Sequence, residues 1–129
     1  KTPDFVVKNQ QYYFKENGTW SAISSGKISV RYSSKGYIIS NAGMAIFCDT
    51  NNLKYIIAFM NSKCVSEKLL KVINQTLNFN AGDIEKLPLL LKNDSKEIII
   101  NLSNSNIKTE KTDWDSYETS WDFKRNPLV

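Results

Sequence analysis

The residues of this chain that are best equipped to contact a ligand lie between Thr19 and Lys35. They combine an aromatic ring with hydroxyl groups and positive charges: Trp20, Ser24, Ser25, Lys27, Arg31 and Lys35. Lysine and serine near turns bind phosphate groups, and short polar or bidentate side chains distinguish base edges. The stretch therefore predicts a DNA contact, although on spacing alone a solvated sheet face over core aromatic residues is the more common explanation.

The side chains that most enzyme mechanisms need are absent or scattered. The 129 residues include no His, so neither a Ser-His nor a Cys-His nucleophile pair can form. The sequence has no P-loop and no dinucleotide-binding glycine pattern, and its acidic residues lack the paired positions of a two-metal site. Cys48 and Cys64 lack CxxC spacing, so we expect two buried thiols without a zinc site or disulfide. We therefore predict no catalytic residue, cofactor or metal in this chain.

The charge of the chain is unevenly distributed along its length. Residues 1–92 carry 12 Lys and Arg against 6 Asp and Glu, whereas residues 93–129 carry 5 against 7. The first part, at +6, could face an anion such as DNA, and the second part, at −2, is less suited to that role. No apolar run is long enough to span a bilayer and no signal peptide is present, so we expect a soluble, cytoplasmic protein. Because the sequence starts at Lys1 rather than Met, we expect a fragment of a longer protein.

The elements that must position these residues begin with short strands. Turn residues recur roughly every eight to ten positions before Asp49, which predicts a small, mostly antiparallel sheet. Lys27–Tyr32 alternates polar and apolar residues as a half-buried strand does, and Glu16–Gly18 is predicted as a turn. The other predicted strands are Tyr12–Phe14, Thr19–Ile23, Tyr37–Ser40 and Met44–Cys48.

A helical hairpin is predicted to follow and to pack on the sheet. Apolar residues recur at helical spacing over Asn51–Asn61, and a second helix starts at Ser62 or Ser66 and ends near Asn74. The next stretch contains an extended segment at Thr76–Phe79 and a single helical turn, Ile84–Leu87, which Asp83 caps and Pro88 ends.

A last helix is predicted from Lys96 to about Tyr117, with an apolar stripe at Ile99, Leu102, Ile107 and Trp114. This stripe is thin for a self-contained domain, so we expect it to pack on other parts of the parent protein or to drive self-association. The predicted fold class is thus α+β, with a recognition-like domain at residues 1–92 and a helical spacer with an aromatic tail at residues 93–129.

Several stretches resemble known restriction–modification proteins, and Arg31-Tyr32, Gly36–Ile39 and Ala42-Gly43 continue the first of those described next. Tyr13–Lys27 resembles the opening of a specificity half-domain in the large adenine-specific methyltransferases of BREX and Pgl-type phage-exclusion systems. Ala58–Ser62 looks like the helix end "Leu-Leu-Asn-Ser" of that family, and Asp113–Phe123 is similar to its element "Asp-Trp-Asp-Ser-Phe-Glu-Thr-Ser-Trp-Asp-Phe". Asn74–Leu89 resembles the "Leu-Asn-Phe…Gly-Asp-Ile…Leu-Pro" signature of target-recognition regions, including those of type I specificity subunits.

The resemblance implies a parent enzyme that transfers a methyl group from S-adenosylmethionine to adenine N6. The catalytic Asn-Pro-Pro-Tyr motif and the glycine-rich cofactor motif of that family are absent here and would lie upstream. For this chain, the resemblance implies target recognition on duplex DNA, no activity of its own, and an upstream methyltransferase domain as partner. Recognition regions of this family fix no individual base-contacting residue, so the six residues named first remain hypotheses from chemistry.

Two other functions stay open. In the first, the long helix and the aromatic tail dock a partner subunit, and the basic bias of residues 1–92 is incidental. In the second, the chain is a nuclease domain of a combined restriction–methylation enzyme, against which the lack of clustered carboxylates argues.

Overall fold

The computed structural model describes residues 9–40, 43–76 and 78–128. The chain divides into two compact units, residues 1–89 and residues 90–129, near the boundary predicted after residue 92. A three-stranded antiparallel sheet is followed by helices, which confirms the predicted α+β class. Within the described residues, no helix is both long enough and apolar enough to cross a membrane.

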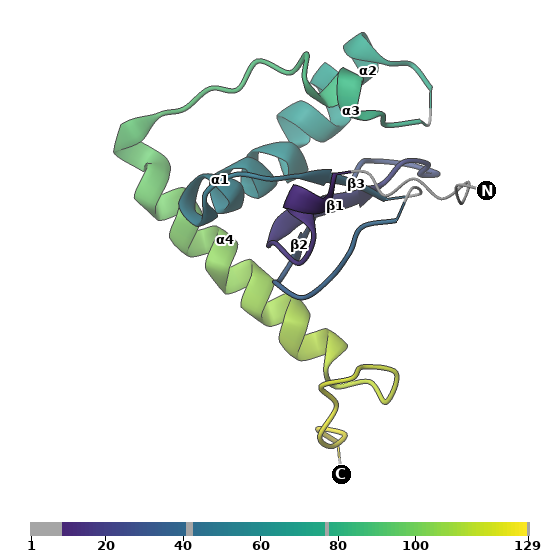
Figure 1. The fold of residues 1–129 in the computed structure, drawn as a ribbon. Helices are drawn as coiled ribbons and strands as arrows, with labels where there is room; N and C mark the ends of the chain where they lie inside the picture. Colours follow the sequence, from purple (N-terminus) through teal and green to yellow (C-terminus); the bar gives the residue numbers. More distant parts are fainter. Residues whose placement is uncertain (1–8, 41–42, 77, 129) are drawn as a thin grey trace, which may run out of the picture. The chain divides into compact units, whose positions relative to one another are not determined.

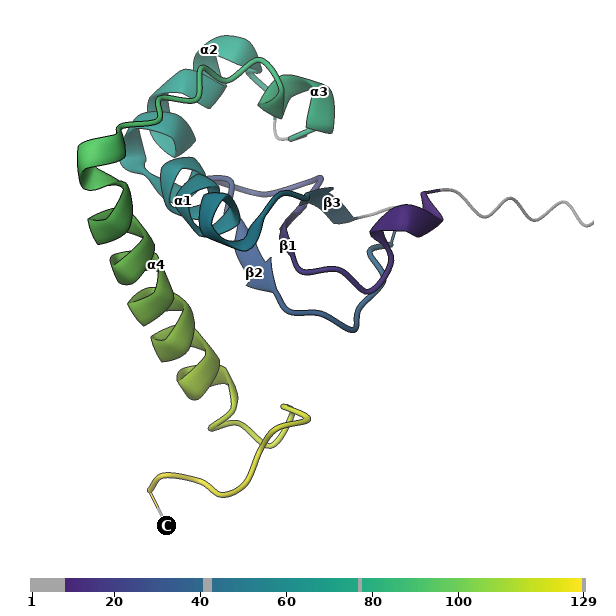
Figure 2. The ribbon, with the colours of Figure 1, turned by 60° about the vertical axis from the view of Figure 1, so that its left-hand side comes forward.

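The first unit is built on a sheet whose strands lie in the order β2-β1-β3 (Figures 1 and 2). Strand β1 spans Asn17–Ser21, β2 spans Arg31–Ser33, and β3 spans Gly43–Ile46. Both neighbours are antiparallel to β1, and Thr19 lies opposite a residue of each of them. Only the end of the predicted strand Lys27–Tyr32 joins the sheet, but its alternation is confirmed, since Ile28 and Val30 are buried between exposed neighbours.

The predicted turn at Glu16–Gly18 is wrong, because Asn17 and Gly18 begin the central strand. A β-carbon on Gly18 would stand 3.1 Å from Ile57 Cγ1 and 3.3 Å from Val30 Cγ1. Glycine is therefore needed here for the close approach of β1 to its neighbours, and not for a turn.

The strands predicted at Tyr12–Phe14 and Tyr37–Ser40 are also wrong. Residues Gln10–Tyr12 form a short 3-10 turn, η1. Phe14 and Gly36 both have positive φ, at 61° and 107°, which takes the backbone out of an extended conformation. The two segments are instead linked by hydrogen bonds from Phe14 N to Tyr37 O and from Gly36 N to Phe14 O, both 3.1 Å.

The predicted helical hairpin is present. Helix α1, Thr50–Asn61, begins where the Asp49 side chain accepts a hydrogen bond from Asn52 N at 3.1 Å, and it packs against β1 and β2. A π-helical turn, η2, spans Cys64–Leu69 and continues into α2, Leu70–Ile73. The core between sheet and hairpin consists of Trp20, Ile28, Val30, Leu53, Ile57, Met60, Val65, Leu70 and Phe79.

The segment after α2 returns to the sheet. Ile23 and Asn78 form an isolated antiparallel bridge, which places part of the predicted extended segment Thr76–Phe79 beside the end of β1; Leu77 lies outside the described residues. The short helix α3 spans Ala81–Ile84 and therefore begins earlier than the predicted Ile84–Leu87. Asp83 does not cap it, because it lies within the helix, whose N-cap position is Asn80. The Asp83 carboxylate instead accepts a hydrogen bond from Asn74 Nδ2 at 2.6 Å.

The second unit contains the long helix α4, Asn93–Trp114, and the tail that follows it. The predicted C-terminal helix is thus confirmed, with both ends displaced toward the N-terminus. Leu102 and Trp114 are exposed, so much of the predicted apolar stripe is uncovered. Beyond α4, successive turns lead to Phe123, and the side chain of Lys111 joins Asp115 at 2.8 Å and Asp122 at 2.6 Å.

Candidate nucleic-acid interface

The candidate interface is centred on the loop of residues 22–30 between β1 and β2. At its start, Phe79 N donates a hydrogen bond to Ala22 O at 2.7 Å. At its end, the side-chain amide of Asn61 donates to Val30 O at 2.8 Å and accepts from Val30 N at 2.9 Å. Both ends of the loop are therefore held by residues from outside it, while residues 25–27 are exposed.

The tip of this loop brings together three of the six predicted contact residues. Ser24 Oγ donates to Lys27 O at 3.2 Å and accepts from Gly26 N at 3.4 Å, which shapes the turn, and Ser25 is exposed beside it. The exposed Lys27 ammonium forms an ion pair with the carboxylate of Glu67 on η2. The hydrogen bond from Lys27 is the main cause that lowers the pKa of the Glu67 carboxyl.

A groove of about 540 Å³ separates the loop tip from the helical hairpin. Leu70 and Phe79 belong to the buried core at its base, whereas Lys71, Gln75 and Thr76 are exposed. None of the lining residues is acidic, and the complete set is Gly26, Lys27, Ser66, Leu70, Lys71, Asn74, Gln75, Thr76 and Phe79.

Lys63, Lys68 and Lys71 are all exposed. The sequence analysis did not single out Lys71 as a neighbour of the loop tip. The only sequence signal for that proximity is the 74–89 motif, whose Asn78 and Phe79 bond to Ile23 and Ala22 and so bring the end of α2 to the loop.

Trp20 packs in the buried core, and this corrects the prediction that its aromatic ring contacts DNA. Its side chain is 3% exposed, and the indole N–H donates a hydrogen bond to Phe79 O at 2.8 Å. A buried indole N–H normally takes such a partner. The ring therefore has no open face for stacking on a base.

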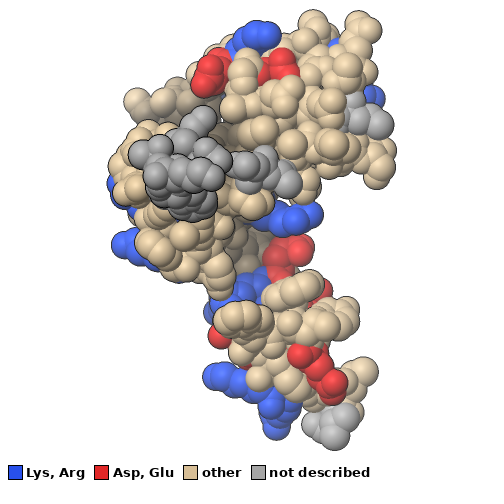
Figure 3. Space-filling view, turned by 45° about the vertical axis from the view of Figure 1, so that its right-hand side comes forward, with Lys and Arg blue, Asp and Glu red and all other residues tan. Residues whose placement is uncertain are grey.

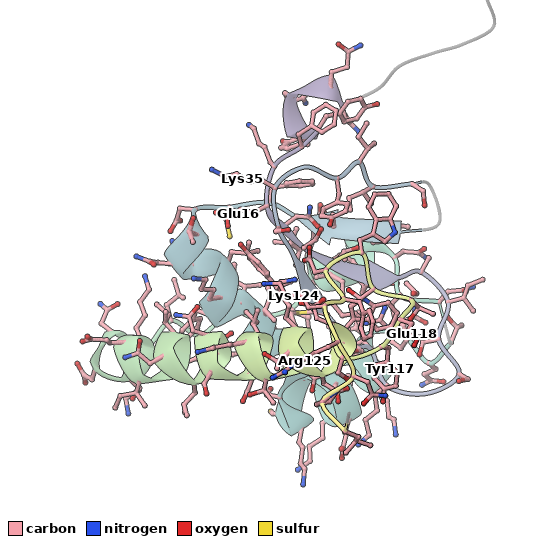
Figure 4. All side chains as sticks on the ribbon, turned by 90° about the horizontal axis from the view of Figure 1, so that it is seen from below. Glu16, Lys35, Tyr117, Glu118, Lys124 and Arg125 are labelled. Carbon is pink, nitrogen blue, oxygen red and sulfur yellow. The ribbon has the colours of Figure 1, made fainter. Side chains whose placement is uncertain are left out.

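The remaining two predicted residues lie on the other side of the loop, around β2. Arg31 is exposed and alternates with Val30 and Tyr32, which contribute to the core, so it belongs to the opposite face of the sheet. Lys35 follows β2 and is a neighbour of Glu16 (Figure 4). The structure thus groups Ser24, Ser25 and Lys27 and places Arg31 and Lys35 apart from the groove.

Glu16 joins β2 to the start of α1. Its carboxylate accepts hydrogen bonds from the Thr50 hydroxyl and, at 2.7 Å, from the Tyr32 hydroxyl. The bond from Thr50, followed by that from Tyr32, lowers the pKa of Glu16. Burial, followed by the bond to Glu16, raises the pKa of Tyr32 to about 12. The hydrogen bond thus favours the ionised carboxylate of Glu16 and the protonated phenol of Tyr32. Such a pair is a structural contact and does not suit acid–base chemistry near neutral pH.

The expectation of two buried thiols is wrong for Cys64, which is exposed at the start of η2. Cys48 is partly buried, and that burial raises the pKa of its thiol. Among the described residues, no three His, Cys, Asp or Glu side chains gather as metal ligands would.

Charged side chains are interspersed on the surface. On the face shown in Figure 3, Lys and Arg lie among Asp, Glu and a large uncharged area, without a continuous basic band. Any anion contact on this face would therefore depend on a few placed lysines and not on a strong overall field.

The tail of the second unit exposes aromatic rings on a series of hydrogen-bonded turns. Asp115 also accepts a hydrogen bond from Ser120 Oγ at 2.7 Å, so Lys111, Asp115 and Asp122 hold the turns together. The hydrogen bond from Lys111, followed by that from Ser120, lowers the pKa of Asp115. Trp114 is 59% exposed, Tyr117 is 57% exposed and Trp121 is fully exposed. Figure 4 shows how Tyr117, Glu118, Lys124 and Arg125 are distributed over this tail.

Comparison with known proteins points to one class. No family model matches the chain. Two curated relatives do, and both carry the name adenine-specific methyltransferase. The similarity covers nearly all of this chain, including its loop, hairpin and aromatic tail.

The first relative is BrxX of Escherichia coli O9:H4 (strain HS), which is 36% identical over 126 residues, or 95% of this chain and 10% of that protein. The second is PglX of Lacticaseibacillus casei (strain Zhang), which is 36% identical over 122 residues, or 94% of this chain and 10% of that protein. The chain thus spans about a tenth of the length of the curated relatives it matches. This similarity supports the link to BREX and Pgl-type methyltransferases that the motifs implied.

Proposed function

We propose that this chain is the DNA target-recognition part of an adenine-N6 methyltransferase that acts in phage defence. In this proposal, the methyl group of S-adenosylmethionine is transferred by a catalytic domain elsewhere in the parent protein. The present chain contacts the duplex and presents it to that domain.

The observation that carries the proposal is the shared groove of the loop tip and α2. It brings Lys27 and Lys71 to one place, together with the hydroxyl and amide groups of Thr76 and Gln75, without an acidic lining residue. Lysines hold phosphates, and amide side chains can pair with adenine N6 and N7. The matched proteins supply the context, because they are named for methylation of adenine, while this chain lacks the motifs for methyl transfer.

Fluorescence anisotropy on a random-sequence duplex, titrated from low salt upward, tests the proposal. Phosphate contacts make the logarithm of affinity fall linearly with the logarithm of salt concentration, by roughly 0.9 per phosphate neutralised. The charge reversals Lys27→Glu and Lys71→Glu should weaken binding and flatten this slope. Lys63→Glu, an exposed position that does not line the groove, is the matched control.

Arg31→Glu tests the other face of the sheet in the same assay. If Arg31→Glu weakens binding and Lys27→Glu does not, the duplex contacts the open sheet face and the groove assignment fails. If neither reversal has an effect, both assignments fail.

A transplant tests recognition directly. The matched tenth of BrxX would be replaced by this chain, and the methylated DNA sequences would be mapped. A recognition part should change the sequence that is methylated, whereas a scaffold should leave it unchanged in an active chimera.

The exposed aromatic residues of the tail favour a second function, docking to a partner protein. Trp114, Tyr117 and Trp121 present rings of the type enriched at protein interfaces. Such binding should respond little to salt, in contrast to DNA binding. A complex that survives high salt and is lost in Trp121→Ala would favour docking.

A further inference from the structure

We propose that Phe14 and Tyr37 form an aromatic platform that stacks on an unpaired base of a DNA strand, while Lys15 and Lys35 contact the neighbouring phosphates. None of these four residues lines the groove at the loop tip. The inference rests on the proposed function and deepens it. An adenine that leaves the duplex for methylation leaves its thymine partner unpaired, and such a base is the ligand that the platform would take.

Phe14 is an unfavourable residue for its place in the fold. Its φ of 61° lies in the left-handed region, which glycine and asparagine adopt with least strain. Its backbone is fixed there, because Phe14 N donates to Tyr37 O and Phe14 O accepts from Gly36 N, both at 3.1 Å. These hydrogen bonds need no aromatic side chain, and the Phe14 side chain is 58% exposed, so burial offsets little of the strain. An exposed ring on a strained backbone thus points to a contact made by the ring itself.

Tyr37 adds a second exposed ring beside Phe14. The backbone hydrogen bonds place the two residues side by side, and Tyr37 is 61% exposed. Tyr13 supports the Phe14 ring in an edge arrangement, with the ring centroids 6.3 Å apart and the planes at 87°. Tyr12 is engaged elsewhere, since its ring stacks on Phe47 at 4.7 Å. The rings of Phe14 and Tyr37 are therefore open to stacking, which any base accepts because every base has a flat π-face.

The charge around the platform favours a nucleic-acid strand over an apolar protein surface. Residues 9–40 carry four Lys and Arg side chains against one acidic side chain, Glu16. The Glu16 carboxylate already accepts hydrogen bonds from two hydroxyl groups. Lys15 and Lys35 are exposed, and neither forms an ion pair with another described residue. Exposed aromatic rings next to such lysines are the combination that binds single strands, with the rings on the bases and the charges on the phosphates.

Fluorescence anisotropy with two labelled strands of equal length tests the stacking. One strand is oligo(dT), whose bases do not pair with one another, and the other carries abasic sites throughout. Both strands offer the same phosphates, so a difference in affinity reports on the bases alone. Oligo(dT) should bind roughly tenfold more tightly than the abasic strand.

Variants of the two rings then test the platform. Phe14→Asn and Tyr37→Ala should each weaken oligo(dT) binding roughly tenfold and leave binding of the abasic strand unchanged. Tyr117→Ala is the matched control, because Tyr117 is a similarly exposed tyrosine of the second unit, and it should have no effect. Because each ring is tested alone, a folding defect in one variant leaves the other decisive.

The stability of Phe14→Asn separates a binding role from a structural one. Asparagine suits the left-handed backbone, so this variant should unfold at the same urea concentration as the parent chain or at a higher one. A ring that only stabilises the fold predicts the reverse, with unfolding at lower urea and unchanged binding of oligo(dT).

Lys15→Gln and Lys35→Gln test the phosphate contacts. Each should weaken binding of both strands by the same factor, and each should flatten the slope of log affinity against log salt by roughly 0.7. Lys63→Gln carries the same charge change and is the control. Lys63 follows the C-terminal end of α1, whereas Glu16 is bonded to Thr50 at the other end of that helix.

Several outcomes would overturn the proposal. These are equal affinity for the two strands, equal losses in Tyr37→Ala and Tyr117→Ala, or full oligo(dT) binding in both Phe14→Asn and Tyr37→Ala. Equal effects of Lys15→Gln, Lys35→Gln and Lys63→Gln would remove the phosphate contacts. No binding of either strand at low salt would also overturn the proposal and would favour a protein partner for the two rings.

This inference and the proposed function fail in different ways. Suppose that Lys27→Glu and Lys71→Glu weaken duplex binding, while Phe14→Asn binds oligo(dT) as the parent chain does. The proposed function would then stand, and the platform would be overturned. Binding of oligo(dT) that depends on Phe14 and Tyr37, without any binding of duplex, would keep the platform and overturn the duplex contact of the proposed function.

Discussion

Replacing Gly18 by Ala should destabilise the first unit through the contact of β1 with α1. The added β-carbon would lie 3.1 Å from Ile57 Cγ1 and 3.3 Å from Val30 Cγ1, and both side chains belong to the buried core. Forcing a methyl group into a packed core costs about 1–3 kcal/mol. The reduced entropy of the unfolded chain returns about 0.4–1 kcal/mol. We therefore expect a net loss of about 0–2.6 kcal/mol in the free energy of unfolding, with a midpoint near 1.3 kcal/mol.

Urea unfolding followed by tryptophan fluorescence measures this loss. Trp20 is 3% exposed, whereas Trp114 and Trp121 are exposed, so the shift in emission on unfolding reports chiefly on the first unit. Gly26→Ala is the matched control, because a β-carbon there would meet no atom within 4 Å. It receives the same gain from the unfolded chain without the clash, so it should be about 0.4–1 kcal/mol more stable than the parent chain. The reasoning would be refuted if Gly18→Ala were as stable as Gly26→Ala.

Four further predictions concern the contacts that join the elements and that hold the tail. Asn61→Ala removes both hydrogen bonds to Val30 and should lower the unfolding free energy by about 1–2 kcal/mol in the same assay. Unchanged stability would show that these two hydrogen bonds are not needed. The pKa of Tyr32 is raised to about 12, so the folded chain holds this proton while the unfolded phenol ionises near its ordinary value of about 10. Stability should therefore fall between about pH 10 and pH 12, and Tyr32→Phe should show less of this fall in pH-dependent unfolding. The pKa of Glu16 is lower in the folded chain than in the unfolded chain. Its contribution to stability is therefore present above the unfolded-state pKa and is lost as pH falls through the folded-state pKa, so the stabilities of the parent chain and Glu16→Gln should converge in acid. Lys111→Gln should loosen the tail turns, seen as faster proteolytic cleavage after α4, and an unchanged cleavage rate would show that the ion pairs do not hold them.

Local patterns predicted the helices and missed part of the sheet. Helix α1 was predictable because its apolar residues repeat at helical spacing and Asp49 precedes it as a cap. Gly18 was misread as a turn residue, because sequence alone does not reveal that a helix lies 3.1 Å from its missing β-carbon. The groove was unpredictable for the same reason, since it depends on the bridge between Ile23 and Asn78, which are distant in sequence.

The motifs that carry the family resemblance prove to hold the fold together. Asn61, in the "Asn-Ser" helix end, pairs with the backbone of Val30. Phe79, in the 74–89 motif, fills the core and accepts the indole hydrogen bond of Trp20. This explains why recognisable motifs gave the context of the chain but no contact residue. Of the six residues chosen by chemistry, three meet at the loop tip, and their role in DNA contact stays a prediction.

The loop of residues 22–30 is fastened at Ala22 by Phe79 and at Val30 by Asn61, so its two ends do not depend on its exposed tip. We therefore expect that residues 25–27 can be exchanged with little effect on the sheet or the hairpin, apart from loss of the exposed ion pair between Lys27 and Glu67. A loop that is fastened at both ends can change rapidly in sequence. A few codon changes alter the ligand preference of its tip while the free energy of unfolding stays constant. A library randomised at Ser25, Gly26 and Lys27 should accordingly yield mostly folded proteins, which makes the loop tip the natural place to engineer altered specificity.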